Sequence, residues 1–125
     1  MTHAIGEYKM DIVEFMAKNE ISLYVDADLK TNEFNIIKTS TQLTSYSLFV
    51  QLILHNTPDI LLHTITGQIM PRMWRQGNVR CIISQPNHNH IIALFYENTL
   101  DAKENYLHAL ELNNTITNLF SNHTV

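Results

Sequence analysis

Two apolar, β-prone runs in the second half of the chain constrain its fold most. They span residues 79–84 and 91–96, and the polar segment 85–89 separates them. Runs rich in β-branched side chains that are joined by a short polar segment are typical of a β-hairpin. We therefore expect two central antiparallel strands here, the second beginning at about His90.

A second hairpin is predicted earlier in the chain. Apolar and polar side chains alternate along residues 21–26, and residues 33–39 form another β-prone run after a polar stretch. Asp26 and Asp28 flank the turn between them, where aspartate is favoured because its carboxylate accepts hydrogen bonds from the nearby backbone. We interpret both as turn residues rather than as a catalytic pair of carboxylates.

Two amphipathic helices are expected near the ends of the chain. The first covers residues 7–19, where apolar side chains recur at helical spacing. The last covers residues 100–120, and Asn98 or Thr99 is its expected N-cap. The apolar stripe of the last helix is predicted to comprise Tyr106, Ala109, Leu110, Ile116 and Phe120, with Leu107 and Leu119 beside it.

A further helix is predicted over residues 43–55. A helix that covers a sheet needs an apolar stripe only about 100° wide, whereas apolar side chains surround most of this axis. Leu48, Phe49 and Leu52 are therefore candidate interface residues that a partner covers, in a homodimer or a heteromeric complex. The internal alternative is that residues 60–65 fold back over the second face of the helix.

The segment that follows has two interpretations. Thr57, Pro58 and Asp59 form a helix-start pattern, because proline at the first helical position loses no hydrogen bond and aspartate faces the positive end of the helix dipole. Residues 60–66 also have the composition of a strand. Gly67 ends the element in either case.

Together these elements predict an α+β fold. We expect a single domain in which three helices cover an antiparallel sheet of about five strands. The length of 125 residues is close to the commonest size of one domain, and only three glycines and three prolines are present, which leaves little composition for a flexible linker.

Charge and composition exclude several classes of partner. Eight Lys and Arg against twelve Asp and Glu give a net charge of −4, the opposite of the basic surface that binds nucleic acid. No apolar run approaches membrane-spanning length, so we expect no membrane insertion. A single cysteine is consistent with a reducing compartment, and we expect a cytoplasmic protein.

The residues that could carry chemistry are few. His88 and His90 are possible metal ligands, but no Cys or carboxylate pair nearby completes a ligand set, so a solvated turn is favoured and metal binding stays open. Cys81 lies inside a β-prone run and is interpreted as a packed thiol rather than a nucleophile. No nucleophile motif and no phosphate-binding loop is present. We expect no enzyme activity and no cofactor.

Arg72, Trp74 and Arg75 form the second candidate contact with a partner protein. An aromatic ring beside guanidinium groups is a combination enriched at interface hot spots. A tryptophan in the core, with two arginines whose stems lie on apolar surface, is the alternative. Residues 34–96 are locally positive, whereas both ends of the chain are acidic.

The order of these elements resembles that of the roadblock/LC7 family. The likeness comprises a short helix, a hairpin whose turn contains Asp26 and Asp28, an apolar helix at 43–55, later strands and a terminal helix through Phe120. It implies a non-enzymatic dimer that scaffolds or regulates partners, often small GTPases or motor and signalling complexes. The family commonly has a glycine after the acidic position of this hairpin, and residues 27–32 contain none.

Two alternatives remain. Small acidic chaperones of bacterial type III secretion systems also combine three helices with an antiparallel sheet, dimerise and hold an extended effector segment, and residues 91–120 are similar to their last strand and closing helix. Those chaperones usually have three strands before their second helix, where this sequence predicts two. A small enzyme that uses His88, His90 and a distant carboxylate is the third hypothesis.

Overall fold

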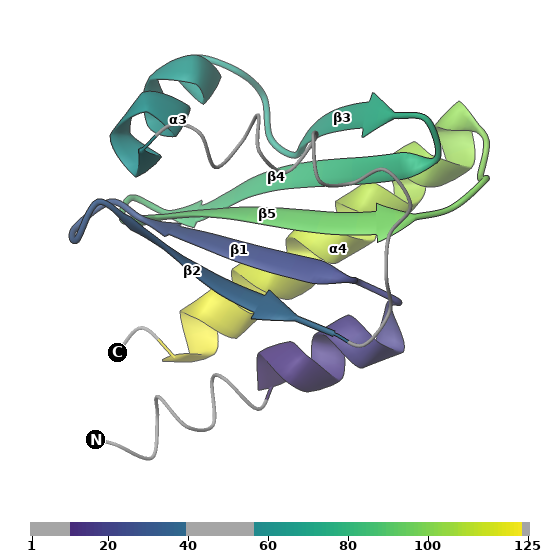
Figure 1. The fold of residues 1–125 in the computed structure, drawn as a ribbon, viewed down its shortest axis with the longest axis horizontal. Helices are drawn as coiled ribbons and strands as arrows, with labels where there is room; N and C mark the ends of the chain where they lie inside the picture. Colours follow the sequence, from purple (N-terminus) through teal and green to yellow (C-terminus); the bar gives the residue numbers. More distant parts are fainter. Residues whose placement is uncertain (1–10, 40–56, 124–125) are drawn as a thin grey trace.

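A five-stranded antiparallel sheet forms the centre of the protein (Figure 1). The computed structural model describes residues 11–39 and 57–123. The strand order is β2-β1-β5-β4-β3, and every neighbouring pair is antiparallel. The strands are β1 (Leu23–Asp28), β2 (Glu33–Lys38), β3 (Arg72–Gln76), β4 (Val79–Asn87) and β5 (His90–Glu97).

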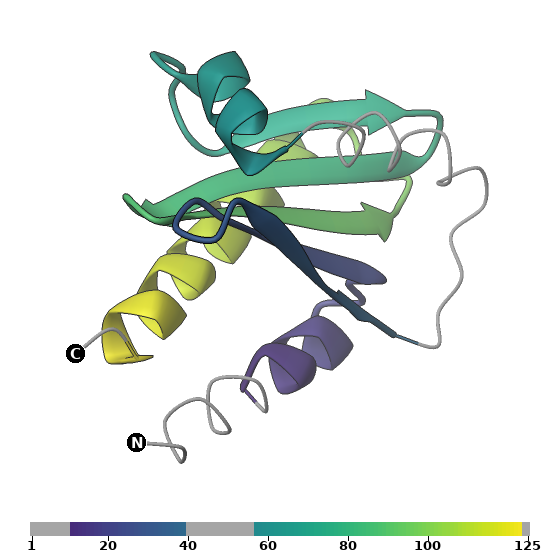
Figure 2. The same cartoon turned by 60° about the vertical axis from the view of Figure 1, so that its left-hand side comes forward.

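Helices lie on both faces of this sheet. The first helix, described from residue 11 to 18, and α4 (Ala102–His123) cover one face, and α3 (Pro58–Ile65) covers the other (Figures 1 and 2). The predicted α+β fold, with five antiparallel strands and three helices, is confirmed. The helix predicted over residues 43–55 lies outside the described residues.

Both predicted hairpins are present, and local hydrogen bonds explain their turns. In the first, the carboxylate of Asp28 accepts hydrogen bonds from the backbone amides of Lys30 and Thr31, at 2.9 and 3.3 Å. In the second, the side-chain oxygen of Asn87 accepts a hydrogen bond from the amide of Asn89 at 2.8 Å. Asparagine and aspartate favour turns for this reason. β5 is the central strand of the sheet, as the sequence predicts.

The segment after residue 56, for which the sequence allows a helix or a strand, is a helix. α3 has Pro58 in its first turn, and the side-chain oxygen of Asn32 accepts a hydrogen bond from the amide of Asp59 at 3.1 Å. Proline and aspartate suit this end because the first helical amides lack partners within the helix. Gly67 follows the helix with a φ of +82°, a conformation that glycine adopts without steric cost.

The position of the fifth strand was not predicted from the sequence. β3 consists of Arg72–Gln76, a largely polar run, and the turn at Gly77 and Asn78 connects it to β4. Gly77 has a φ of +62°. As an edge strand, β3 needs less apolar burial than a central strand, so its sequence lacks the β-prone composition of residues 79–84.

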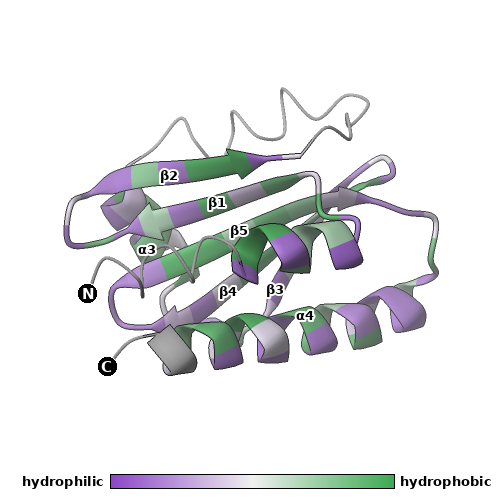
Figure 3. Ribbon diagram, turned by 90° about the horizontal axis from the view of Figure 1, so that it is seen from below, coloured by the Kyte–Doolittle hydropathy of each residue, from purple (hydrophilic) through white to green (hydrophobic). Residues whose placement is uncertain are grey.

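The sheet separates two apolar cores, because successive side chains of a strand point to opposite faces. In β4, Cys81 and Ile83 face α3, whereas Ile82 faces α4. The α3-side core comprises Leu23, Val25, Ala27, Leu61, Ile65, Val79, Cys81, Ile83, Ile91, Ala93 and Phe95. The α4-side core comprises Ile12, Phe15, Met16, Ile21, Tyr24, Ile82, Ile92, Leu94, Tyr96, Ala109, Leu112, Ile116 and Phe120. Figure 3 shows the apolar sides of the first helix and α4 turned toward the sheet.

α4 differs from its prediction in its start and in its buried stripe. Asp101, not Asn98 or Thr99, caps the helix, since its carboxylate accepts a hydrogen bond from the amide of Glu104 at 2.8 Å. Tyr106 and Leu107, predicted to be buried, are about half exposed. The buried stripe is Asn105, Ala109, Leu112, Ile116 and Phe120.

The reason for this shift is a buried polar contact. Asn105 is 4% exposed, and its side-chain oxygen accepts a hydrogen bond from the hydroxyl of Tyr96 at 2.8 Å. Because this contact places Asn105 against the sheet, the neighbouring Tyr106 is rotated away from it by about 100° around the helix axis.

Candidate interaction surface

β3 is an edge strand and carries three of the predicted interface residues. It pairs with β4 on one side, and no strand of the described sheet pairs with its other side. An edge strand presents unpaired backbone amide and carbonyl groups that another chain can pair with. Arg72 and Arg75 are exposed, and Trp74 is half-buried.

The alternation of β3 divides these three side chains between the two faces of the sheet. Trp74 pairs with Cys81 and packs against the α3-side core. Arg72 lies two residues away and shares this face, whereas Arg75 lies on the α4 side. The structure therefore brings Arg72 and Trp74 together and separates Arg75 from them. Trp74 has features of both interpretations, since it contacts the core and keeps part of its surface exposed.

A second arginine lies opposite Arg75. The two residues Arg75 and Arg80 are directly paired across β3 and β4, where like charges are unfavourable. Their side chains are directed to different partners. Arg75 Nε donates to the carbonyl of Gly77 at 2.7 Å, and an Arg80 terminal nitrogen donates to the carbonyl of Leu100 at 2.9 Å. Arg80 is 7% exposed, and its Nε is buried without a hydrogen-bond partner. The sequence gives no signal that this arginine is buried.

Leu48, Phe49 and Leu52, the other predicted interface residues, lie outside the described residues. Their part in a contact stays a prediction.

Asp26 is not the turn residue that the sequence predicts. It is 8% exposed, and its Oδ1 lies 2.8 Å from His90 Nδ1. Strand pairing explains the contact, because Asp28 is the register partner of His90 and Asp26 lies two residues along the same face. The hydrogen bond that Asp26 accepts from the imidazole raises the pKa of His90, and the negative charges of Asp26 and Asp28 act in the same direction.

The two histidines considered as metal ligands have different surroundings. His88 is exposed in the β4–β5 turn, whereas His90 is engaged with Asp26 and packs against the ring of Phe120, with ring centroids 5.1 Å apart. Across residues 11–39 and 57–123, no group of three or more His, Cys, Asp or Glu side chains is arranged to hold a metal ion.

Cys81 is a packed thiol, as the sequence predicts. It is fully buried in the α3-side core, and burial raises the pKa of its thiol well above the ordinary value. The reactive form of a cysteine is the thiolate. The geometry therefore disfavours Cys81 as a nucleophile.

Fold and surface together define an α+β domain whose sheet, in the part that the structure describes, has two edge strands, β2 and the positively charged β3. No protein-family model matches the chain, and a search of curated proteins finds no match. No helix among the described residues is long and apolar enough to cross a membrane.

Proposed function

We propose that this protein is a non-catalytic interaction domain that acts in the cytoplasm as a homodimer or as one half of a heteromeric complex. The observation that carries the proposal is the edge of β3, which no other strand of the described sheet pairs with. Arg72 and the half-buried Trp74 lie on its α3-side face, and the exposed Arg75 lies on its α4-side face. A partner strand that adds to such an edge gains main-chain hydrogen bonds, and neighbouring side chains give specificity.

The element order supports the same proposal. Two strands precede residues 40–56 and three follow α3, with the first helix before β1 and α4 after β5. This order is similar to that of the roadblock/LC7 family, whose members scaffold or regulate small GTPases and multiprotein complexes as dimers. A type III secretion chaperone is the alternative function, and the presence of two strands rather than three between the first helix and residue 39 counts against it.

The test measures molar mass and the effect of reversing charge at the edge strand. We expect the purified protein to sediment at micromolar concentration with a mass above that of one 14.5 kDa chain, alone or with its partner. Arg72→Glu and Arg75→Glu should each weaken this association about tenfold, because hot spots at interfaces often contain arginine.

Two controls separate loss of the interface from loss of the fold. Lys103→Glu makes the same change of charge at an exposed position of α4 and should leave the mass unchanged. Arg75→Glu places an acid opposite Arg80 and should not destabilise the sheet. A wild-type protein that is monomeric at micromolar concentration, with no partner in native extracts, contradicts the proposal.

A further inference from the structure

The outer side of β3 presents backbone hydrogen-bonding groups at alternate residues. A two-residue turn follows Gln76, so Gln76 and Val79 exchange both backbone hydrogen bonds of their pair. Because these groups alternate in direction along a strand, the amides and carbonyls of Met73 and Arg75 point away from β4. In the part of the chain that the structure describes, no strand pairs with them (Figure 1). An added strand can therefore form main-chain hydrogen bonds with Met73 and Arg75.

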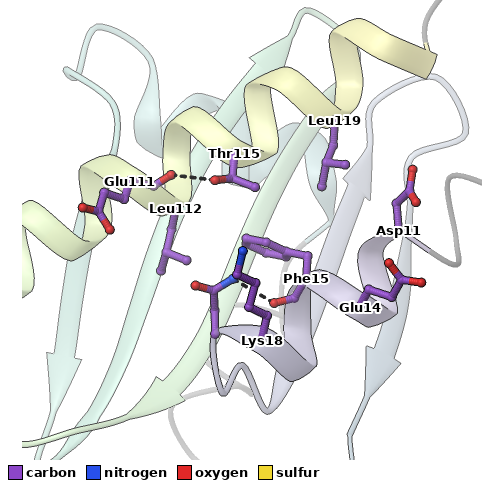
Figure 4. A pocket seen from close by; sticks show the side chains of 9 residues that line it. Asp11, Glu14, Phe15, Lys18, Glu111, Leu112, Thr115 and Leu119 are labelled. Carbon is purple, nitrogen blue, oxygen red and sulfur yellow. Dashed lines mark hydrogen bonds between the residues drawn. The ribbon is translucent and has the colours of Figure 1, made fainter.

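The same edge of the sheet carries positive charge without a compensating carboxylate. Residues 60–96 contain three arginines and no aspartate or glutamate, and all three arginines lie in β3 or β4. None of the three forms an ion pair with another described residue. Three acidic side chains of the first helix and α4 lie elsewhere, around the space between those helices, where Figure 4 shows Asp11, Glu14 and Glu111. The β3 edge therefore favours an anionic partner.

The arginines are divided between the two faces of the sheet. Arg72 shares the α3 side with Trp74, whereas Arg75 lies on the α4 side, where Arg80 of β4 is its direct pair. Arg80 is 7% exposed, so water solvates its charge poorly and the positive charge near Arg75 is not screened by solvent alone. A partner strand neutralises both exposed arginines of β3 only if it carries carboxylates on both of its faces.

A second copy of β3 does not meet this requirement. Two identical edge strands that pair antiparallel about a two-fold axis would bring Arg72 and Arg75 of both copies to one junction. β3 contains no acidic residue, and like charges across neighbouring strands are unfavourable. The other edge strand, β2, has one acid and one base, Glu33 and Lys38, and so has no net charge that would attract an anionic segment.

We propose that the β3 edge binds an extended acidic segment of a different protein, which joins the sheet as an added antiparallel strand. Antiparallel pairing is the pattern of every neighbouring pair in the described sheet and is the more stable arrangement per residue. The inference rests on the proposed function of this edge and names the chemistry of the partner.

The positions of the two exposed arginines set the pattern of the segment. Arg72 and Arg75 are three residues apart and on opposite faces, so the segment has two acidic residues three positions apart. From its N-terminus the order is acidic, apolar, any residue and acidic. The first acidic residue lies opposite Arg75, the apolar residue opposite Trp74, and the second acidic residue opposite Arg72.

The probe is a capped ten-residue peptide of threonine with glutamate, valine, threonine and glutamate in that order at its centre. A spacing control has the order glutamate, valine, glutamate, threonine. It has the same composition and charge, but both carboxylates lie on one face of a strand, so it can pair with only one arginine. A charge control has lysine in place of both glutamates. By NMR titration we expect the spacing control to bind about threefold more weakly and the lysine peptide at least tenfold more weakly.

Amide hydrogen exchange distinguishes an added strand from a peptide that is held by charge alone. With saturating glutamate peptide, the amides of Met73 and Arg75 should exchange at least tenfold more slowly, because they gain main-chain partners. The amides of Arg72 and Trp74 already face β4 and should change little. Unchanged exchange at Met73 and Arg75 overturns the proposal.

Reversal of charge on both sides of the contact tests the register. Arg75→Glu should weaken binding of the glutamate peptide about tenfold, and lysine in place of the first glutamate of the peptide should restore it to within about threefold. Arg72→Glu should be rescued in the same way by lysine at the second glutamate. Because Arg75 Nε also donates to the carbonyl of Gly77, amide spectra must show that the sheet of Arg75→Glu is intact. Lys103→Glu, at an exposed position of α4, should leave the affinity unchanged.

The outcomes separate this inference from the proposed function. Equal affinity for the three peptides, amide shifts in β2 instead of β3, or failure of both rescues overturns the inference. Self-association that Arg75→Glu abolishes, in a protein that does not bind the glutamate peptide, overturns the acidic partner but supports an interaction domain. A monomer that binds neither the peptide nor a partner in native extracts contradicts both.

Discussion

His90 Nδ1 lies 2.8 Å from Asp26 Oδ1, and this contact joins the start of β5 to β1 within the sheet. The side chains are 25% and 11% exposed, so the pair is partly shielded from water. The ring of Phe120 from α4 packs against the imidazole. The contact therefore connects two central strands to the C-terminal part of α4.

Stability should depend on pH through His90. Asp26 raises its pKa by accepting a hydrogen bond, and the charges of Asp26 and Asp28 add to this effect, against the opposing effects of desolvation and Lys30. The folded state thus binds the proton more tightly than the unfolded state. This stabilisation is complete below the ordinary histidine pKa of about 6.5 and disappears as pH rises through the raised pKa.

We expect the free energy of unfolding to fall as pH rises from about 6 to 8 in the wild type. His90→Gln keeps a donor for Asp26 but does not titrate, so its stability should change less over this range. Urea unfolding at a series of pH values measures the difference. His88→Gln, in the exposed turn two residues away, is the control and should behave like the wild type. Identical pH profiles for His90→Gln and the wild type would contradict the assignment.

The hydrogen bond between Tyr96 and Asn105 should stabilise the attachment of α4. Both side chains are almost fully buried, and removal of the Tyr96 hydroxyl leaves Asn105 Oδ1 with only the longer hydrogen bond from Asn98 Nδ2 at 3.4 Å. We expect Tyr96→Phe to lower the free energy of unfolding by about 1 kcal/mol. Tyr106→Phe, half exposed one residue beyond Asn105, should change it by less than about 0.5 kcal/mol. Equal effects of the two substitutions, measured by urea unfolding, would show that the buried contact contributes little.

Cys81 should be unreactive in the folded protein. It is fully buried and its thiol pKa is raised, so little thiolate is present and reagents have no access. We expect a thiol reagent such as dithionitrobenzoate to label the native protein only as fast as the protein opens, and to label it at once in concentrated guanidinium. Rapid stoichiometric labelling of the native protein would place this thiol at the surface.

The two cores should contribute comparably to stability. Ile82 and Ile83 are consecutive and both fully buried, but the first belongs to the α4-side core and the second to the α3-side core. We expect Ile82→Ala and Ile83→Ala each to destabilise the protein by about 2–5 kcal/mol, because each leaves a cavity. Ile69→Ala, 90% exposed, should cost less than about 0.5 kcal/mol. A small loss for Ile83→Ala alone would mean that α3 is not part of the cooperative unit.

Most elements could be predicted from the sequence because their signals are local. The β4–β5 hairpin follows from two β-branched runs around a polar turn, and the start of α3 follows from Thr57, Pro58 and Asp59. Periodicity also predicts a last helix, but not which of its neighbouring residues faces the sheet. That choice depends on the buried partner of Asn105, Tyr96, in another element.

Strand order and the contacts that it creates were decided only by the tertiary structure. β3 has a polar sequence and is recognised as a strand only because β4 pairs with it. The sequence predicts that Asp26 is a turn residue. In the structure β5 pairs with β1, and this pairing places His90, 64 residues away in the sequence, against the carboxylate of Asp26. The physical reason is that the local sequence sets the extended conformation of a strand, whereas the choice of the strand that pairs with it depends on the burial of both faces of the whole sheet.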